Sequence, residues 1–300
     1  MVHGSKRWRL GAVALAALGV LLSGWTAAAT AAAPSLYVAL GDSYTAGPVI
    51  PVQQTNPAGC LRSDHNYPHL LAAARGLALH DVSCSGATTA DMTSAQNVTP
   101  GPANPPQFDA LTPDTKLVTI GIGGNDIGFV SILENCAALT PVGPTRSGAS
   151  TCQSTYVSNG DDKISDAIRA TAPKVGAVLD GIHQRSPSAR VYVVDYLDIL
   201  PVTGNGCWPQ MPLTYADVPY LRAKEVELNG MLATTAAAHH ARLVDAYSAS
   251  IGRDTCQLPT SRWVEPVVPI NPAAPVHPNA AGMVGTAAAV AARVVGTGDG

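Results

Sequence analysis

The sequence predicts an α/β fold in which a parallel β-sheet is covered by helices on both faces. Five short runs of mostly apolar or β-branched residues alternate with longer stretches that have helix-like spacing of apolar residues. Several of these runs carry almost no polar residue, as is expected of strands that are buried on both sides. Alternation of strands and helices is typical of a parallel sheet, so one α/β domain is the simplest interpretation.

The runs place the expected elements along the chain. The candidate strands are residues 36–40, 79–84, 117–122, 190–196 and 241–247. The candidate helices are residues 67–75, 127–139, 161–184, 219–239 and 278–295, and the last two are rich in alanine. The connections contain many prolines, most of all residues 99–113 and 258–278, which we expect to be ordered loops because proline restricts the unfolded chain.

Composition excludes some classes of partner. The chain has 300 residues, of which 46% are hydrophobic and 13% are charged, and its formal net charge is −3. The 18 lysines and arginines are scattered, whereas a nucleic-acid-binding protein needs a basic stripe. We therefore expect no nucleic-acid partner, and we expect the protein to act as a monomer.

Residues 1–33 have the pattern of a secretory signal peptide. A basic segment precedes an apolar run over residues 10–22, and an alanine-rich stretch with Ala-x-Ala cleavage patterns follows. The apolar run is shorter than the roughly 20 residues that a membrane-spanning helix needs. We expect cleavage near Ala31 or Ala33 and a mature domain over residues 34–300. The expected protein is secreted and extracellular, without stable insertion into a membrane.

Six cysteines fit an exported chain, because an even number in that compartment favours disulfide bonds. We expect the sequential pairing, since each bridge then closes one excursion between core elements. The expected bridges are Cys60–Cys84, Cys136–Cys152 and Cys207–Cys256. No two cysteines have C-x-x-C spacing, so zinc is not indicated and we expect no metal site.

The segment GDSYTAG, residues 41–47, places Ser43 directly after the first candidate strand. A glycine turn followed by Asp-Ser at the start of a helix would bring Ser43 to the carboxyl edge of the sheet, where α/β folds bind ligands. The N–H groups at the start of that helix would stabilise an oxyanion. Taken alone, the segment is equally compatible with a helix cap formed by Asp42 or Ser43. It is not the G-x-S-x-G elbow, because Thr45 replaces the second glycine.

Three later segments bring further reactive groups to the same edge. CSGATT places Gly86 in a turn, GIGGNDIGF places Asn125 after the third strand, and APVHPNAAG places His277 before the last helix. A glycine N–H, an asparagine amide and an imidazole beside a serine are the components of acyl-transfer chemistry. These four ordered blocks resemble those of the SGNH hydrolase superfamily, also called GDSL lipases and esterases. The secretion signal, the six cysteines and the length are similar to its secreted bacterial lipase/esterase branch.

The resemblance implies a flavodoxin-like, three-layer α/β/α sandwich with a five-stranded parallel sheet. It implies that Ser43 is the nucleophile and that His277 is its general base. It further implies an oxyanion hole formed by the Ser43 N–H, the Gly86 N–H and the side-chain amide of Asn125, with no cofactor.

One position departs from the family pattern. The family commonly has an aspartate three residues before the histidine, and here that residue is Ala274, whose methyl group cannot accept a proton. We expect the main-chain carbonyl of Ala274 to orient His277, because a turn would keep it near and because the family includes members with such a carbonyl. Asp254 and Glu265 are the alternatives, although nothing in their spacing directs them at His277.

These features predict a secreted serine carboxylic-ester hydrolase that acts on a lipid or another acyl ester. Triacylglycerol lipase or broad esterase is the first expectation, and phospholipase A is the second. A polysaccharide-deacetylating acetylesterase is a different enzymatic alternative, and a secreted binding protein on the same scaffold is the non-enzymatic one. Trp208 and Trp263 either contact an acyl chain or anchor their loops, and Asp126 either orients Asn125 or caps the next helix.

Overall fold

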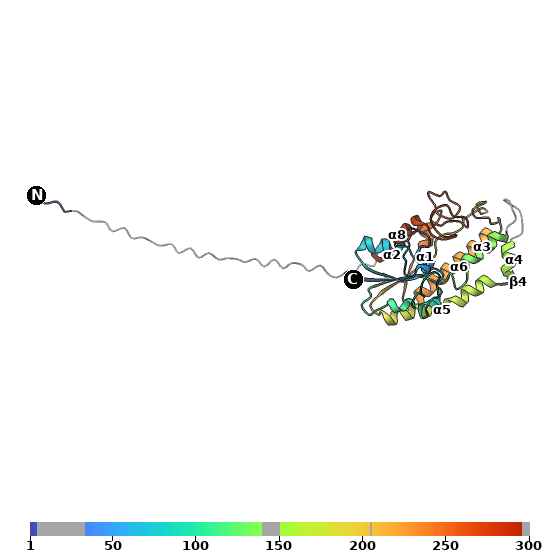
Figure 1. Cartoon of the computed structure of the whole chain (residues 1–300), viewed down its shortest axis with the longest axis horizontal. Helices are drawn as coiled ribbons and strands as arrows, with labels where there is room; N and C mark the ends of the chain where they lie inside the picture. The colour runs from blue at the N-terminus through green and yellow to red at the C-terminus, as the bar shows by residue number, and fades with distance from the viewer. Residues whose placement is uncertain (5–33, 140–150, 205, 296–300) are drawn as a thin grey trace. The chain divides into compact units, whose positions relative to one another are not determined.

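The computed structural model of the chain describes residues 1–4, 34–139, 151–204 and 206–295 (Figure 1). Its main feature is a five-stranded sheet with the strand order β2-β1-β3-β6-β7. Every neighbouring pair of strands is parallel, and this order is that of flavodoxin-like folds. The prediction of a five-stranded parallel sheet is confirmed. The strands are β1 Leu36–Gly41, β2 Ala78–Asp81, β3 Leu117–Gly121, β6 Arg190–Val194 and β7 Arg242–Val244.

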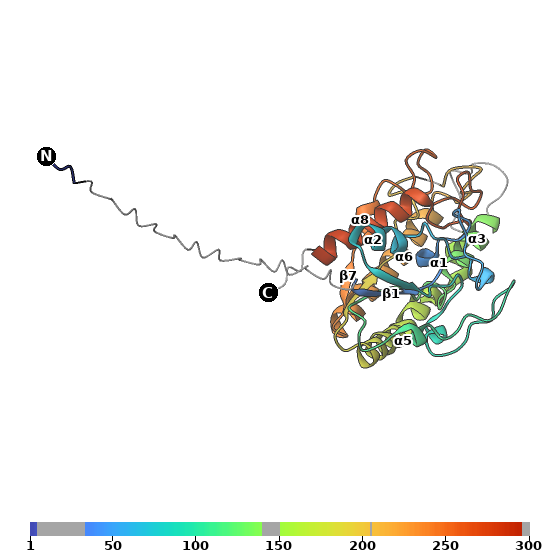
Figure 2. The same ribbon diagram turned by 60° about the vertical axis from the view of Figure 1, so that its left-hand side comes forward.

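Helices cover both faces of the sheet, which gives the expected three layers. Figures 1 and 2 show α2 and α8 above the sheet and α5 below it. On the first face α2 packs against α8, and on the other α5 packs against α6. All five expected helices occur close to their expected positions: α2 Tyr67–Arg75, α3 Phe129–Leu139, α5 Lys163–Arg185, α6 Asp217–Ala238 and α8 Ala280–Val295.

The structure differs from the expected elements at the ends of β2, β6 and β7, which stop at Asp81, Val194 and Val244, and in the connections. The run over residues 241–247 stops being a strand at Val244, because Asp245 caps a short helix by accepting a hydrogen bond from the Ser248 N–H. Several short elements lie between the main ones. They are α1 Ser43–Ala46, η1 Ala58–Cys60, η2 Thr89–Met92, η3 Gln107–Ala110, α4 Thr151–Tyr156, β4 Val157–Ser158, β5 Asp161–Asp162 and α7 Ala246–Ser250.

Three disulfide bonds cross-link the segments between the main strands, and the second of them joins α3 to α4. They join Cys60 to Cys84, Cys136 to Cys152 and Cys207 to Cys256, which is the sequential pairing expected from the sequence. The first links the segment after α1 to the segment after β2, and the third links the loop after β6 to the loop after α7. The first and third bridges therefore hold together segments that emerge from the same edge of the sheet.

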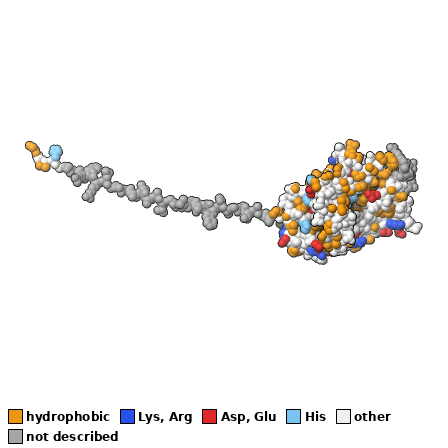
Figure 3. Space-filling view, in the orientation of Figure 1, with side chains coloured by type: hydrophobic (Ala, Val, Ile, Leu, Met, Phe, Trp, Pro, Cys, Tyr) orange, Lys and Arg blue, Asp and Glu red, His pale blue; other side chains and the backbone are white. Residues whose placement is uncertain are grey.

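In the described part of the chain no helix is both long enough and apolar enough to span a bilayer. On the face shown in Figure 3, acidic and basic side chains are few and scattered, and the basic ones form no stripe. The expected signal peptide falls almost wholly on residues outside the described ranges, and contacts group Pro34–Gly300 into one unit.

The end of β1 is a turn that only glycine fits. Gly41 has a φ of 141°, and its N–H and carbonyl are bridged by the side-chain amide of Gln107 at 2.7 and 2.9 Å. A Cβ atom at Gly41 would collide with the side chain of Thr45 and would lie 2.7 Å from the carbonyl oxygen of Gly121. The chain therefore turns sharply at the sheet edge and delivers Ser43 there.

Substituting Gly41→Ala is expected to destabilise the protein by about 2 kcal/mol or more, because the turn is strained for a side chain and backbone atoms block the Cβ. The matched control is Gly230→Ala in the exposed part of α6, where nothing lies within 4 Å of the added Cβ. That control should gain about 0.5–1 kcal/mol from its helix position. Guanidinium unfolding of the two variants measures both, and equal stabilities would contradict the account of the turn.

Candidate active site

Ser43 is the first residue of α1 and lies at the carboxyl edge of the sheet. Asp42 caps this single turn of helix: its carboxylate accepts a hydrogen bond from the Tyr44 N–H, and its carbonyl accepts from Thr45 and Ala46. Within the described ranges nothing accepts a hydrogen bond from the N–H of Ser43 itself. A one-turn helix has little dipole, so the expected anion stabilisation here depends on that single N–H group.

His277 reaches Ser43 from the other end of the chain. Its Nε2 lies 2.7 Å from the Ser43 Oγ, and its Nδ1 lies 2.6 Å from the carbonyl oxygen of Pro275. A main-chain carbonyl was expected as the partner of Nδ1, but the choice of Ala274 was wrong by one residue. The Ala274 carbonyl accepts the main-chain N–H of His277 at 3.2 Å, and this turn leaves the Pro275 carbonyl to meet the imidazole.

The Pro275 carbonyl decides which imidazole nitrogen carries the proton. A carbonyl can only accept a hydrogen bond, so the proton lies on Nδ1 and Nε2 is free to accept the Ser43 hydroxyl proton. His277 is 9% exposed, and burial lowers its pKa below the ordinary value of 6.5, although the bond to Pro275 acts in the opposite direction. The imidazole is therefore neutral near pH 7, which is the form that acts as a base.

The carboxylates of Asp254 and Glu265 are used within the loop that precedes His277. The Asp254 carboxylate accepts hydrogen bonds from the Cys256 N–H and from the side-chain amide of Gln257. Trp263 anchors the same loop, because its ring packs against α8 where a Cβ at Gly285 would collide with it. Glu265 is fully buried and accepts hydrogen bonds from the main chain of Ile270 and Asn271 and from the side chains of Asn271 and Asn279. Both acids therefore have a structural role.

The other two expected oxyanion-hole residues lie close together. Asn125 lines the same pocket as Ser43, and its Nδ2 donates one hydrogen bond to the Ala87 carbonyl at 2.9 Å. An amide nitrogen has two hydrogens, so the second remains for a ligand. Gly86 directly precedes Ala87 and has a φ of 81°, which glycine adopts without strain. Ser43 and Asn125 follow neighbouring strands at the point where the strand order reverses, which is where such folds bind ligands.

Asp126 acts through a residue that the sequence did not suggest, Thr89. Its carboxylate accepts hydrogen bonds from both the N–H and the hydroxyl of Thr89, at 3.0 and 2.6 Å. Thr89 begins η2, in the segment that also contains Gly86. Asp126 therefore ties the loop after β2 to the loop after β3, and fixes Gly86 and Asn125 relative to each other.

Tyr44 connects the nucleophile segment to the histidine loop. Its hydroxyl donates a hydrogen bond to the carbonyl of Val276 at 2.7 Å, and its ring centre lies 5.3 Å from that of His277. Val276 has a φ of 60°, a left-handed conformation that is strained for a β-branched residue. The bond from Tyr44 holds this strained residue in place, and so positions His277. The sequence contains Tyr44 inside the serine motif, but gives no sign of its partner.

Tyr196 connects the serine segment to the asparagine segment. Its hydroxyl donates to the Asp42 carboxylate at 2.6 Å and accepts from the Gly124 N–H at 2.7 Å. Burial raises the pKa of Asp42 to about 7, against the hydrogen bonds from Tyr196 and from the Tyr44 N–H. A Cβ at Gly124 would lie 2.7 Å from the Tyr196 hydroxyl, so glycine is required at that position. The sequence places Tyr196 at the end of a strand without indicating this function.

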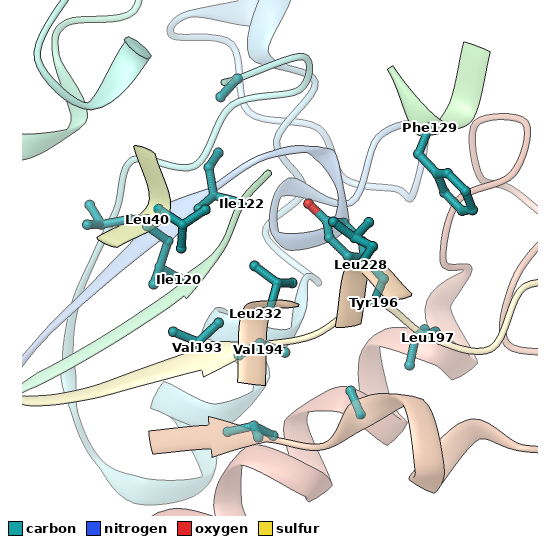
Figure 4. Packing of buried hydrophobic residues seen from close by; sticks show 14 of the residues in the cluster. Leu40, Ile120, Ile122, Phe129, Val193, Val194, Tyr196, Leu197, Leu228 and Leu232 are labelled. Atoms are coloured by element: carbon teal, nitrogen blue, oxygen red, sulfur yellow. The ribbon is translucent and has the colours of Figure 1, made fainter. Parts of the chain in front are cut away.

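Ser43 opens into a pocket with mainly apolar walls. Besides Asp42, Ser43, Gly124 and Asn125, the lining consists of Tyr44, Phe129, Val130, Tyr196 and Leu228. Figure 4 shows Phe129, Tyr196 and Leu228 beside this end of the sheet, with the Tyr196 hydroxyl directed towards α1. An apolar wall next to a nucleophile suits an acyl chain better than a sugar or a charged group.

Sequence comparison places the chain in a family of known proteins. Residues 39–284 match the sequence profile of the GDSL-like lipase/acylhydrolase family. The chain belongs to this family. Lipase 2 of Streptomyces coelicolor is 41% identical over 277 residues, which cover 89% of this chain and 90% of that protein. Lipase 1 of the same organism is 32% identical and covers 92% and 93% of the two chains.

Solved structures agree with this assignment. Phospholipase A1 from Streptomyces albidoflavus superposes on 87% of this chain with a TM-score of 0.69 and 26% sequence identity. An extracellular lipase from Streptomyces rimosus superposes on 86% of the chain with the same TM-score and identity. The expected SGNH hydrolase fold and the secreted bacterial branch are confirmed, and this GDSL-family protein is a carboxylic ester hydrolase of the lipase/esterase type.

Replacing Tyr44 with phenylalanine tests its positioning of His277. Tyr44→Phe keeps the ring but leaves the Val276 carbonyl unpaired, at a cost of about 1–3 kcal/mol. We expect kcat on a soluble ester to fall about tenfold while KM changes little. The control is Tyr67→Phe, which removes a buried hydroxyl that donates to Thr119 on β3. It should lower the melting temperature and leave kcat unchanged, and a Tyr44→Phe variant that lost stability only would contradict the positioning role.

The lowered pKa of His277 predicts the acid limb of the pH–rate profile. The base is active when neutral, and a group with a lowered pKa stays neutral to a lower pH than free histidine. The kcat/KM for a soluble ester should therefore rise with an apparent pKa below 6.5 and be constant above it. A steady-state profile on a protein shown by circular dichroism to stay folded measures this. A limb centred above 6.5 would contradict the burial argument.

Proposed function

We propose that the protein hydrolyses acyl esters through a covalent acyl-enzyme on Ser43, with His277 as the general base. The observation that carries this proposal is the relay from the Pro275 carbonyl through His277 to the Ser43 hydroxyl, at 2.6 and 2.7 Å. The relay gives serine a base with the correct tautomer, at the wall of an apolar pocket.

In the first half-reaction the Ser43 Oγ attacks the ester carbonyl and its proton passes to the Nε2 of His277. The imidazolium that forms is stabilised by the Pro275 carbonyl, which is a dipole and not a full negative charge. The oxyanion receives hydrogen bonds from the Ser43 N–H, the Gly86 N–H and the free amide hydrogen of Asn125. His277 then returns the proton to the departing alcohol.

In the second half-reaction a water molecule attacks the acyl-enzyme. His277 removes a proton from this water, and the same three donors stabilise the second tetrahedral intermediate. Return of the proton to the Ser43 Oγ releases the carboxylic acid. Every protein group used in these steps belongs to this chain.

The natural substrate in this proposal is a water-insoluble ester, with acylglycerols first and phospholipids second. The apolar pocket beside Ser43 supports an acyl chain, and two relatives are named as lipases. A phospholipase A is the second candidate because the similar structure from Streptomyces albidoflavus is a phospholipase A1. A polysaccharide acetylesterase fits less well, since the pocket lining gives a sugar few polar partners.

We also propose that the protein is secreted after removal of residues 1–33. The basic and then apolar start of the sequence supports an export signal. Three disulfide bonds support an oxidising compartment, and the similar lipase of Streptomyces rimosus is described as extracellular. Mass spectrometry of the protein in culture medium tests the proposal, and intact residues 1–33 on the exported protein would contradict it.

Substitution of the three side chains separates their roles. Ser43→Ala and His277→Ala should each remove nearly all hydrolysis of p-nitrophenyl esters without a change in melting temperature. Asn125→Ala should lower kcat by about 10²–10³, because it removes one of three oxyanion donors. Substantial activity in a folded Ser43→Ala variant would contradict the acyl-enzyme. A series of ester chain lengths separates the substrate classes, and preference for acetate would favour the acetylesterase.

A further inference from the structure

Three loops around the candidate site present no charge to solvent. They are residues 47–59 after α1, residues 199–216 after β6, and residues 255–276 before His277. The first two contain no acidic or basic residue. The third contains only Arg262 and Glu265, which are 4% and 0% exposed. Their described residues therefore expose only apolar and neutral polar side chains.

The three loops form one continuous surface. The Ala274 N–H of the third loop donates to the Pro48 carbonyl of the first at 3.2 Å. The Val268 N–H of the third loop donates to the Gln210 carbonyl of the second at 3.1 Å, and the Cys207–Cys256 disulfide joins the same pair. The first loop begins directly after α1, which contains Ser43, and the third ends at His277, so the surface borders the mouth of the site.

Large apolar side chains project from this surface into solvent. Figure 3 shows hydrophobic side chains along the upper edge of the molecule, where the second and third loops lie in Figure 1. We call this surface the apolar rim, and it is defined by Val49, Val52, Trp208, Leu258, Val268 and Ile270, which are between 40% and 72% exposed. Soluble monomers rarely expose so many large apolar groups together, and such patches mark binding surfaces.

We propose that the apolar rim docks the enzyme on the surface of an aggregated, uncharged ester lipid such as an acylglycerol droplet. This proposal rests on the proposed function, because it states the physical form in which the enzyme encounters its substrate. Insertion of the rim buries apolar side chains, and the two charged residues within the loops, Arg262 and Glu265, are buried already. The exposed charges that contact the loops, Asp64 at Val52 and Arg253 at Ser261, lie on neighbouring segments. The rim has no exposed lysine or arginine to attract an anionic membrane, and the net charge of −3 opposes one. Docking there places the mouth of the Ser43 pocket against the lipid.

Partitioning of matched variants into a trioctanoylglycerol emulsion tests the proposal. Val268→Glu places a charge on the rim, and Val226→Glu places the same charge on α6, at a residue of similar exposure, 46% against 55%. Both are made in a Ser43→Ala background so that the lipid is not consumed. The rim variant should bind about tenfold or more weakly, and the α6 variant should bind within about twofold of its parent. Leu258→Glu, elsewhere on the rim, should repeat the loss if Val268→Glu folds poorly.

The same substitutions in the active protein separate docking from chemistry. Hydrolysis of soluble p-nitrophenyl acetate should be unchanged in all of them, and emulsion hydrolysis should fall only in the rim variants. Equal partitioning of rim and α6 variants would overturn the proposal. Stronger binding of the parent protein to anionic phosphatidylglycerol vesicles than to the emulsion would also overturn it. Light scattering that showed the rim to hold two copies of the chain together would also overturn it. Failure of the unchanged protein to cleave any soluble ester would refute the proposed function, whereas the partitioning result would still judge the rim.

Discussion

The hydrogen bond between His277 and Ser43 joins residues 234 positions apart, and the other features of the site serve to make it possible. Ser43 reaches the sheet edge because Gly41 ends β1 in a turn that excludes a side chain. His277 reaches the same edge because a loop anchored by Glu265 and Trp263 ends against α1. Tyr44 then fastens the two ends to each other through the Val276 carbonyl. This bond therefore fixes the serine segment and the histidine loop relative to each other.

A carbonyl in place of a carboxylate changes the electrostatics of the dyad. The Pro275 carbonyl fixes the tautomer of His277 as an acid would, but it stabilises the imidazolium less strongly. Burial nevertheless keeps the pKa of the histidine below its ordinary value, although the Pro275 bond raises it. The proposed enzyme thus has a weaker base that stays in its active form to a lower pH. The nearest carboxyl group of the serine segment, Asp42, is turned to Tyr196 and caps α1, and it organises the site without contacting the imidazole.

Much of the fold and the reactive groups could be predicted from the sequence. Parallel strands place their carboxyl ends on one edge, so the blocks around Ser43, Gly86, Asn125 and His277 had to converge. The prediction of Ala274 was wrong by one residue, because a sequence shows that a turn exists but not which carbonyl faces the imidazole. The roles of Tyr44 and Tyr196 could not be predicted, since each acts through a hydroxyl bond to a distant main-chain group. The end of β7 was missed because capping by Asp245 overrides the apolar pattern.

Covalent labelling tests the central claim, that His277 activates Ser43, most directly. A fluorophosphonate reacts with a serine only when a base increases its nucleophilicity. Incubation of the folded protein, tryptic digestion and mass spectrometry would report the labelled residue and its rate. The account predicts one label per chain, on Ser43, with the rate reduced at least about a hundredfold in His277→Ala. Labelling of a different serine, or of Ser43 at an unchanged rate without His277, would contradict it.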